Sequence, residues 1–415
     1  MVLIRAMSGD RGKALLVVMA LSLVTVQSAV DLPLERVRDA MLEWILGPPP
    51  AEIARIKTLA GTAAVVRGNG HLPATPGTPL YQNDVIETGS DGSVGLTFID
   101  DSVFSAGPDS EVALRQFHFD VDTAHGDMQA ELHKGTLAVV SGAITHSTPG
   151  AMHIKTPTAI LGVRGTTFAL EVTSAAASIP RLGRCQCASE GDADPEPVRC
   201  VATANACEAS CGGVERHGQS FFAAAHDVAV CGPDLRPAEE RYVVLPNADG
   251  RPGSGAVTVE HGKSAETLDR PYAAAELSGG ETLPATFNAA VTDELFHQAL
   301  AARPLLPTHF RLHFLLDSDE MTAESRQDYP AIVADIKKRP SYQVQLIGYT
   351  DALADDAHNL RLSVSRAAAV RRALVKDGVD PNAITAEGRG TADPLVATAA
   401  GIGEPRNRRV EVTIR

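Results

Sequence analysis

Residues 344–367 read VQLIGYTDALADDAHNLRLSVSRA, and this stretch decides the fold of the C-terminal part of the chain. The apolar run Val344–Tyr349 predicts a strand. After a polar loop that starts at Asp351, apolar residues recur at helical spacing and predict a helix over Leu360–Val375. The strand therefore ends beside a carboxylate, and the helix that follows carries a guanidinium, that of Arg366.

The same alternation of strand and helix continues through the rest of the C-terminal segment. It predicts an α/β domain over residues 308–415. A proline is tolerated in the first turn of a helix, so Pro330 is expected to open one. The further elements that we expect are strands at Arg311–Leu316, Ile384–Gly388 and Val410–Ile414 and a helix at Pro330–Lys338.

Four motifs in this segment resemble those of OmpA-like domains: Gly348-Tyr-Thr-Asp351, Asn359-Leu-Arg-Leu-Ser-Val-Ser-Arg366-Ala367, Gly388-Arg-Gly390 and Asn407-Arg-Arg-Val-Glu411. The spacing between the motifs also agrees with the family. Two positions depart from it: Ala354 stands where glycine is usual, and His358 where tyrosine is common. The resemblance implies a non-catalytic domain that binds peptidoglycan.

The resemblance also implies a specific ligand, the diaminopimelate of the peptidoglycan stem peptide, whose free end carries one ammonium and one carboxylate. Asp351 would hold the ammonium, and Arg366 would make a bidentate contact to the carboxylate. Asn359 either contacts the ligand while bracing the loop or acts as a helix N-cap. Thr350 would contribute a minor hydroxyl contact.

Other polar residues near these motifs receive structural roles. Asp317 and Ser318 are expected at the start of a helix, although they could reach the same pocket. Arg408 and Arg409 are expected to be surface charges or a pair that stabilises the fold.

From Ile56 to Val172 the sequence consists of short alternating runs separated by Gly, Asp and Pro, which predicts an all-β domain, either a sandwich or a short solenoid. Three segments resemble FecR-like domains: Gly77–Gly89, Val94–Ser102 and Thr156–Phe168. Asp101 stands where that family usually has glycine. In transmembrane FecR regulators an N-terminal cytoplasmic segment contacts a sigma factor, an activity that we do not expect here.

The six cysteines fall within an insertion at about residues 180–235, where large apolar residues are scarce. Such a segment buries little core, so covalent links would have to hold it. An even number of cysteines in an oxidising compartment predicts up to three disulfides of open connectivity, and a metal site is the less favoured alternative. We expect no metal. The disulfide candidates are Cys185, Cys187, Cys200, Cys207, Cys211 and Cys231.

The β pattern resumes after the insertion, so the FecR-like domain is expected to span residues 56–275. The Gly- and Pro-containing stretch at 276–307, with one helix at Asn288–Ala301, is interpreted as a linker to the C-terminal domain.

The N-terminus has the pattern of an export signal over residues 1–29. Arg5, Arg11 and Lys13 precede a short apolar run, Ala14–Val26. That run is shorter than the roughly 20 residues of a spanning helix. We expect a protein of the periplasm that associates with the cell wall or outer membrane, although an uncleaved signal anchor stays open.

Charge and motifs exclude several classes of function. The net charge is −14, and residues 308–415 contain 15 cationic and 15 anionic side chains, so the whole excess lies before them. An acidic surface repels phosphate backbones, so no nucleic acid partner is expected. No catalytic motif is present, so we expect neither an enzyme nor a cofactor. The FecR-like domain would bind an envelope protein or a glycan. Alternatively, it senses a soluble ligand while wall binding serves only as a tether.

Overall fold

The computed structural model describes the protein from residue 50 onward, with gaps in and after the cysteine-rich insertion. The described residues are 50–173, 183–189, 199–201, 218–223, 239–247, 255–278 and 280–415. The predicted signal peptide and the cysteine side chains fall outside them, and so do the predictions about cleavage and disulfides. Residues Glu52–Arg415 form one compact unit.

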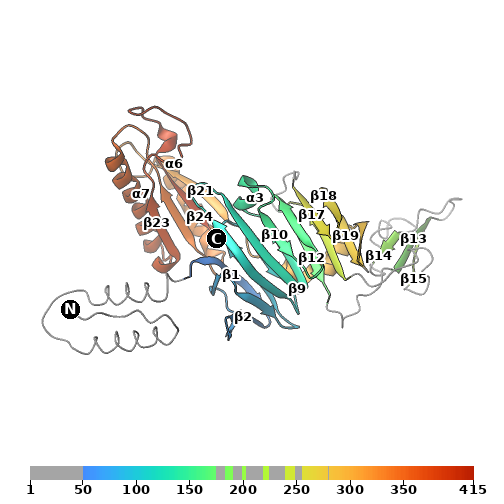
Figure 1. Ribbon diagram of the computed structural model, residues 1–415. Coiled ribbons are helices and arrows are strands. Elements are labelled where there is room, and N and C mark those ends of the chain that lie inside the picture. Colours follow the sequence, from blue (N-terminus) through green and yellow to red (C-terminus); the bar gives the residue numbers. More distant parts are fainter. Residues whose placement is uncertain are drawn as a thin grey trace, which may run out of the picture. The chain divides into compact units, whose positions relative to one another are not determined.

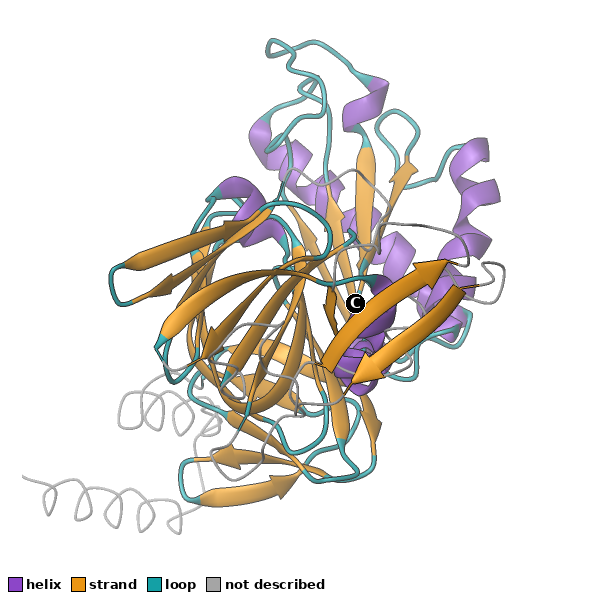
Figure 2. Ribbon diagram, turned by 90° about the vertical axis from the view of Figure 1, so that its right-hand side faces the viewer, coloured by secondary structure: helices purple, strands orange, loops and turns teal. Residues whose placement is uncertain are grey.

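Strands dominate the chain up to residue 286 (Figure 2). One group of strands, here the first sheet, pairs mainly antiparallel and contains β1 (Glu52–Ala60), β4 (Pro79–Tyr81), β6 (Ser93–Phe98), β7 (Val103–Ala106), β12 (Thr167–Val172), β16 (Glu240–Leu245), β19 (Ala273–Ser278) and β20 (Glu281–Thr286). The second sheet contains β2 (Ala63–Arg67), β3 (Gly70–Pro73), β5 (Val85–Thr88), β8 (Glu111–Phe119), β10 (Met152–Lys155), β11 (Ile160–Arg164), β17 (Ala256–His261) and β18 (Ser264–Leu268).

The long strand β9 (Gly126–Val140) belongs to both sheets (Figure 1). Its first part pairs with β8 and runs parallel to β10, and its last part pairs with β7 and β12. A short helix, α3 (Ala143–Ser147), follows it. Three further strands, β13 (Gly183–Ser189), β14 (Arg199–Val201) and β15 (Gly218–Ala223), form a small separate sheet in the insertion.

The two sheets share one hydrophobic core because alternate residues of each strand point inward. Phe98 packs against Phe104 with ring centroids 4.7 Å apart and against Phe117 at 5.6 Å. Met128 and Leu161 of the second sheet belong to the same cluster. We call this part of the chain, residues 52–307, the β domain.

The segment interpreted as a linker, residues 276–307, is part of the β domain, so that interpretation is wrong. Its first residues complete β19 and form β20, and the two strands pair with each other. Helix α5 (Ala289–Ala301), capped by the Asn288 side chain, then buries Phe296 against the outer face of the first sheet.

Small residues on that outer face allow the close approach of α5. Ala138, Ala169 and Ala274 pack with Phe296 in a second apolar cluster. At Gly95 an added Cβ would lie 2.3 Å from the Ala302 carbonyl oxygen, so a side chain there is excluded by the backbone that follows α5. The close fit of α5 to this face therefore holds the helix on the first sheet.

The C-terminal domain, residues 308–415, has a four-stranded sheet with two helices on one face (Figure 1). The strand order is β21 (Thr308–His313), β24 (Arg409–Ile414), β22 (Val344–Gly348) and β23 (Ile384–Gly388), and only β22 and β23 are parallel. The helices are α6 (Ala323–Lys337) and α7 (Asp356–Lys376), with short 3-10 turns at Pro381–Ala383 and Pro405–Asn407.

Helix α6 begins earlier than the sequence suggested. Thr322 caps it by accepting from the Ser325 amide, and Pro330 lies inside the helix and not in its first turn. The buried Ile332 and Ile336 hold the helix on the sheet despite the missing amide hydrogen bond of the proline. None of the helices among the described residues combines the length and apolarity needed to cross a membrane.

Polar contacts join the β domain to the face of the C-terminal sheet that the helices leave free. Lys57 of β1 is 3% exposed and donates to the Gln343 Oε1 and to the Arg415 carbonyl oxygen, each at 3.1 Å. Gln343 donates in turn to Glu52 at 2.9 Å. Burial, with repulsion from the nearby Arg55, lowers the pKa of Lys57 to about 7.

Replacing Phe296 with Ala should lower the free energy of unfolding by about 3–5 kcal/mol, because the ring is 1% exposed and its loss leaves a cavity between α5 and the first sheet. Urea unfolding of the full-length chain measures the change. The neighbouring His297→Ala, whose side chain is 67% exposed, is the matched control and should stay within about 0.5 kcal/mol. Equal, negligible effects would restore the linker interpretation.

Lys57→Met should flatten the dependence of stability on pH above neutrality. The unfolded chain keeps Lys57 protonated up to its ordinary pKa of 10.5, whereas the folded chain releases the proton near pH 7. Between these values the unfolded state binds more protons, so this residue makes the protein more stable as pH rises, by up to about 1.4 kcal/mol per pH unit. Urea unfolding of both proteins from about pH 7.5 to 9.5 measures the slopes. Identical slopes would contradict the buried position of Lys57.

Candidate ligand-binding site of the C-terminal domain

The candidate site lies where the parallel strands β22 and β23 end side by side. Loops after such strands meet at one edge of the sheet, and here the Thr350 amide donates to the Gly390 carbonyl at 2.7 Å. Glycines at both strand ends let α7 approach the sheet: a Cβ at Gly348 would lie 2.1 Å from the Ser363 carbonyl oxygen, and one at Gly388 2.4 Å from the Val364 nitrogen. This packing brings the middle of α7 over the strand ends.

Asp351 is 5% exposed and is held by one cation and one amide. Its Oδ2 pairs with Arg408 Nη1 at 3.0 Å and accepts from the Glu404 amide at 3.2 Å. Its Oδ1 accepts no hydrogen bond from the residues that the structure describes. Arg408, expected to be a surface or fold-stabilising charge, is thus the direct partner of Asp351. Its place next to Asn407 in the last motif is the signal that could have indicated this role.

Arg366 is completely buried, and its guanidinium binds three backbone carbonyls. Nε donates to Ser318 at 2.9 Å, Nη1 to Tyr349 at 2.9 Å and Nη2 to Leu315 at 3.0 Å. Burial lowers its pKa to about 10, and the nearby Asp351 counteracts this by attraction. Three of its five N–H groups are therefore committed to the protein.

The loop whose carbonyls accept hydrogen bonds from Arg366 does not have the role that the sequence predicted for it. Asp317 and Ser318 do not start a helix, since Thr322 caps α6. Instead, the Ser318 carbonyl holds Arg366, while Asp317, with φ +48°, bonds to His358 Nε2 at 2.7 Å. His358, noted as a departure from the family pattern, thereby joins the first turn of α7 to this loop.

Asn359 braces the loop that follows Asp351. Its Nδ2 donates to the Ala354 carbonyl at 2.7 Å, and the side chain is 1% exposed. The alternative of an N-cap is wrong, because Asp355 caps α7 by accepting from the His358 amide. The Thr350 hydroxyl is buried and finds no hydrogen-bond partner among the described residues.

The surroundings of Asp351 combine this polar centre with exposed apolar side chains. The Gly401 amide donates to the Ala352 carbonyl at 2.6 Å and so joins the loop after Asp351 to the loop before Glu404. Leu353 and Ile402, on these two loops, are 48% and 52% exposed. The site therefore combines a partly free carboxylate, the guanidinium of Arg408 and an apolar rim, while the nearby guanidinium of Arg366 is buried.

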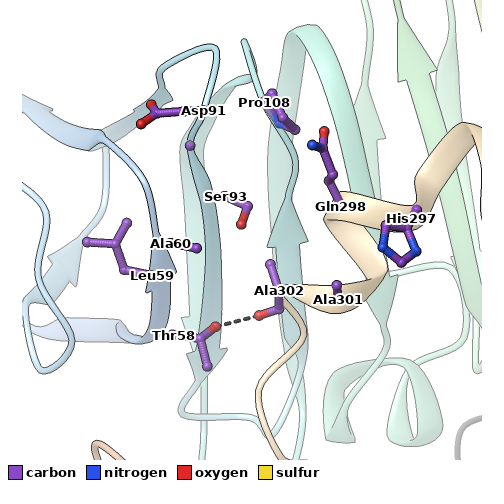
Figure 3. A pocket seen from close by; sticks show the side chains of 11 residues that line it. Thr58, Leu59, Ala60, Asp91, Ser93, Pro108, His297, Gln298, Ala301 and Ala302 are labelled. Carbon is purple, nitrogen blue, oxygen red and sulfur yellow. Dashed lines mark hydrogen bonds between the residues drawn. The ribbon is translucent and has the colours of Figure 1, made fainter.

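A concavity of about 390 Å3 lies in the β domain between α5 and strands β1 and β6 (Figure 3). Figure 3 shows His297 and Gln298 of α5 on one side and Asp91 and Ser93 on the other, with Thr58 bonded to the Ala302 carbonyl. It contains none of the residues predicted to bind a ligand.

Family models match two parts of the chain, in the order expected from the motifs. The model described as FecR protein matches residues 84–180, and the OmpA family model matches residues 313–408. The C-terminal domain is OmpA-like. The OmpA-like match thus covers β22, α7 and β23 and contains all four predicted ligand-binding residues.

Two curated relatives each match about a quarter of this chain or less. "Outer membrane protein A" of Bordetella avium is 35% identical over 101 residues, which cover 24% of this chain and 52% of that protein. "Peptidoglycan-binding protein ArfA" of Mycobacterium tuberculosis is 37% identical over 83 residues, 20% of this chain and 26% of that protein. The chain spans about half or less of the length of these curated relatives. A solved peptidoglycan-associated lipoprotein from Burkholderia pseudomallei is 26% identical, with 25% of this chain and 89% of that chain covered and a TM-score of 0.24.

Arg366→Ala should destabilise the OmpA-like domain and not only remove a ligand contact. Three carbonyls would lose their donor inside the fold, which costs roughly 3 kcal/mol or more. Urea unfolding measures this loss, with Arg361→Ala, an exposed arginine of the same helix, as the control. A fully stable Arg366→Ala protein would show that the carbonyls need no guanidinium.

Proposed function

We propose that this chain is a non-catalytic protein of the cell envelope whose OmpA-like domain binds peptidoglycan through the diaminopimelate of the stem peptide. The observation that carries the proposal is the state of Asp351. Its Oδ2 is fixed by Arg408, while its Oδ1 makes no hydrogen bond to the described residues. A carboxylate with one oxygen left free can accept hydrogen bonds from an ammonium group.

The carboxylate of the same ligand finds cations beside this position. The Arg408 side chain is 15% exposed, and Arg366, although completely buried, has two N–H groups that are not committed to backbone carbonyls. Guanidinium groups bind carboxylates with strong, charge-assisted hydrogen bonds. A ligand end with one ammonium and one carboxylate therefore matches the charges of the site, and the name of the mycobacterial relative, a peptidoglycan-binding protein, supports the same ligand.

We further propose that the β domain is an interaction module for an envelope protein or a glycan. Alternation places charged residues of β8 and β9 on the outer face of the second sheet. There His133 contacts Glu111 at 2.8 Å and Glu131 at 3.2 Å, and Arg115 contacts Glu131 at 2.6 Å. These charged side chains favour a polar partner over an apolar ligand.

Asp351→Asn should weaken sedimentation of the full-length protein with diaminopimelate-type peptidoglycan by roughly tenfold or more, because the amide cannot neutralise an ammonium. Asp356→Asn, an exposed position in the first turn of α7, is the matched control. Arg408→Gln should weaken binding too, since it removes a guanidinium beside the ligand. Circular dichroism checks that each variant is folded.

Lysine-type peptidoglycan supplies the chemical control, since lysine retains the ammonium but lacks the second carboxylate. It should bind the wild-type protein more weakly. Equal binding of both peptidoglycans, or full binding by folded Asp351→Asn protein, would refute the proposed recognition.

A further inference from the structure

Asp101, in the turn between β6 and β7, adopts a backbone conformation that favours glycine. Its φ is +70°, in the left-handed region. Asp tolerates this region better than most residues, but glycine adopts it without steric cost. A side chain that is retained at such a position suggests a role for its carboxylate.

The carboxylate of Asp101 contacts an arginine and a histidine of the OmpA-like domain. Oδ1 pairs with Arg415 Nε at 2.5 Å, and Oδ2 lies 3.3 Å from His309 Nε2. Arg415 is also fixed from its own domain, because its Nη1 donates to Gln345 Oε1 at 3.1 Å. The Arg415 and Asp101 side chains are 13% and 21% exposed, so this ion pair is largely shielded from water. We call Asp101, Arg415 and His309 the Asp101 cluster.

Two further contacts lie on the same face of the C-terminal sheet. One is the buried Lys57 with Gln343 and the Arg415 carbonyl. The other is Arg389, whose Nη1 pairs with Asp122 Oδ1 at 2.7 Å. In the ion pairs Asp101–Arg415 and Asp122–Arg389 the β domain supplies the acid and the OmpA-like domain the base, which agrees with the acidic excess of the chain before residue 308.

We propose that Asp101 docks the β domain onto the helix-free face of the OmpA-like sheet, so that the two domains unfold and act as one unit. The left-handed backbone at this turn is retained because the carboxylate is needed by the other domain. The β domain alone would be more stable with glycine at this position. This inference concerns the relation between the domains and does not depend on the identity of the ligand.

Asp101→Gly tests the proposal by the sign of its effect. Removing the side chain relieves the backbone but deletes the ion pairs, so the thermal midpoint of the full-length chain should fall. Asp109→Gly is the matched control: Asp109 also has a positive φ, +50°, lies in another turn of the β domain and makes no polar contact with the OmpA-like domain in the described part of the chain. That variant should raise the midpoint, by about 1 °C.

A double-mutant cycle with Arg415→Gln shows whether the effect runs between the domains. Once Asp101 is glycine, Arg415→Gln should cause little further loss in the midpoint, since the pair is already broken. Differential scanning calorimetry of the four proteins gives the midpoints. A rise for Asp101→Gly like that for Asp109→Gly, or strictly additive losses in the cycle, would overturn the proposal.

Discussion

The guanidinium of Arg366 holds together the loops on which the candidate site is built. It is buried in the middle of α7 and binds carbonyls of Leu315 and Ser318, after β21, and of Tyr349, after β22. A neutral side chain could not satisfy three converging carbonyls. The position of Asp351, two residues beyond Tyr349, follows from this arrangement. Arg366 is thus as much a structural residue as a candidate ligand contact.

Much of the OmpA-like domain could be predicted from sequence, because its signals are local. The strand expected at Val344–Tyr349 is β22, Val344–Gly348, and the expected helix lies within α7. The binding motifs depend on spacing, which the sequence displays directly. The start of α6 was missed because proline usually marks a first turn, whereas here tertiary packing holds Pro330 within the helix. The partner of Asp351 was missed because the pair Arg408–Asp351 joins residues 57 positions apart.

The misinterpreted linker shows a second limit of sequence reasoning. Glycine and proline around residues 279–307 resemble a flexible connection, and α5 has no strongly amphipathic pattern. What fixes the helix is the complementary surface, where small residues such as Gly95 and Ala169 leave room for it. Each of these residues belongs to a strand whose other face fills the main core. From sequence alone, such small residues indicate only a low strand propensity. Their role in making room for α5 becomes clear only from the structure.

The OmpA-like sheet can contact the β domain and leave the candidate ligand site open, because the two occupy different parts of its surface. The candidate ligand site lies at the ends of β22 and β23, whereas the β domain contacts the face opposite the helices. Residues 389 and 390 contact both the β domain and the candidate ligand site. Arg389 pairs with Asp122 of the β domain, and the adjacent Gly390 carbonyl accepts from the Thr350 amide, next to Asp351. A movement of the β domain that displaced Arg389 would therefore act through the Gly390–Thr350 hydrogen bond on the backbone next to Asp351, the carboxylate proposed to bind the wall.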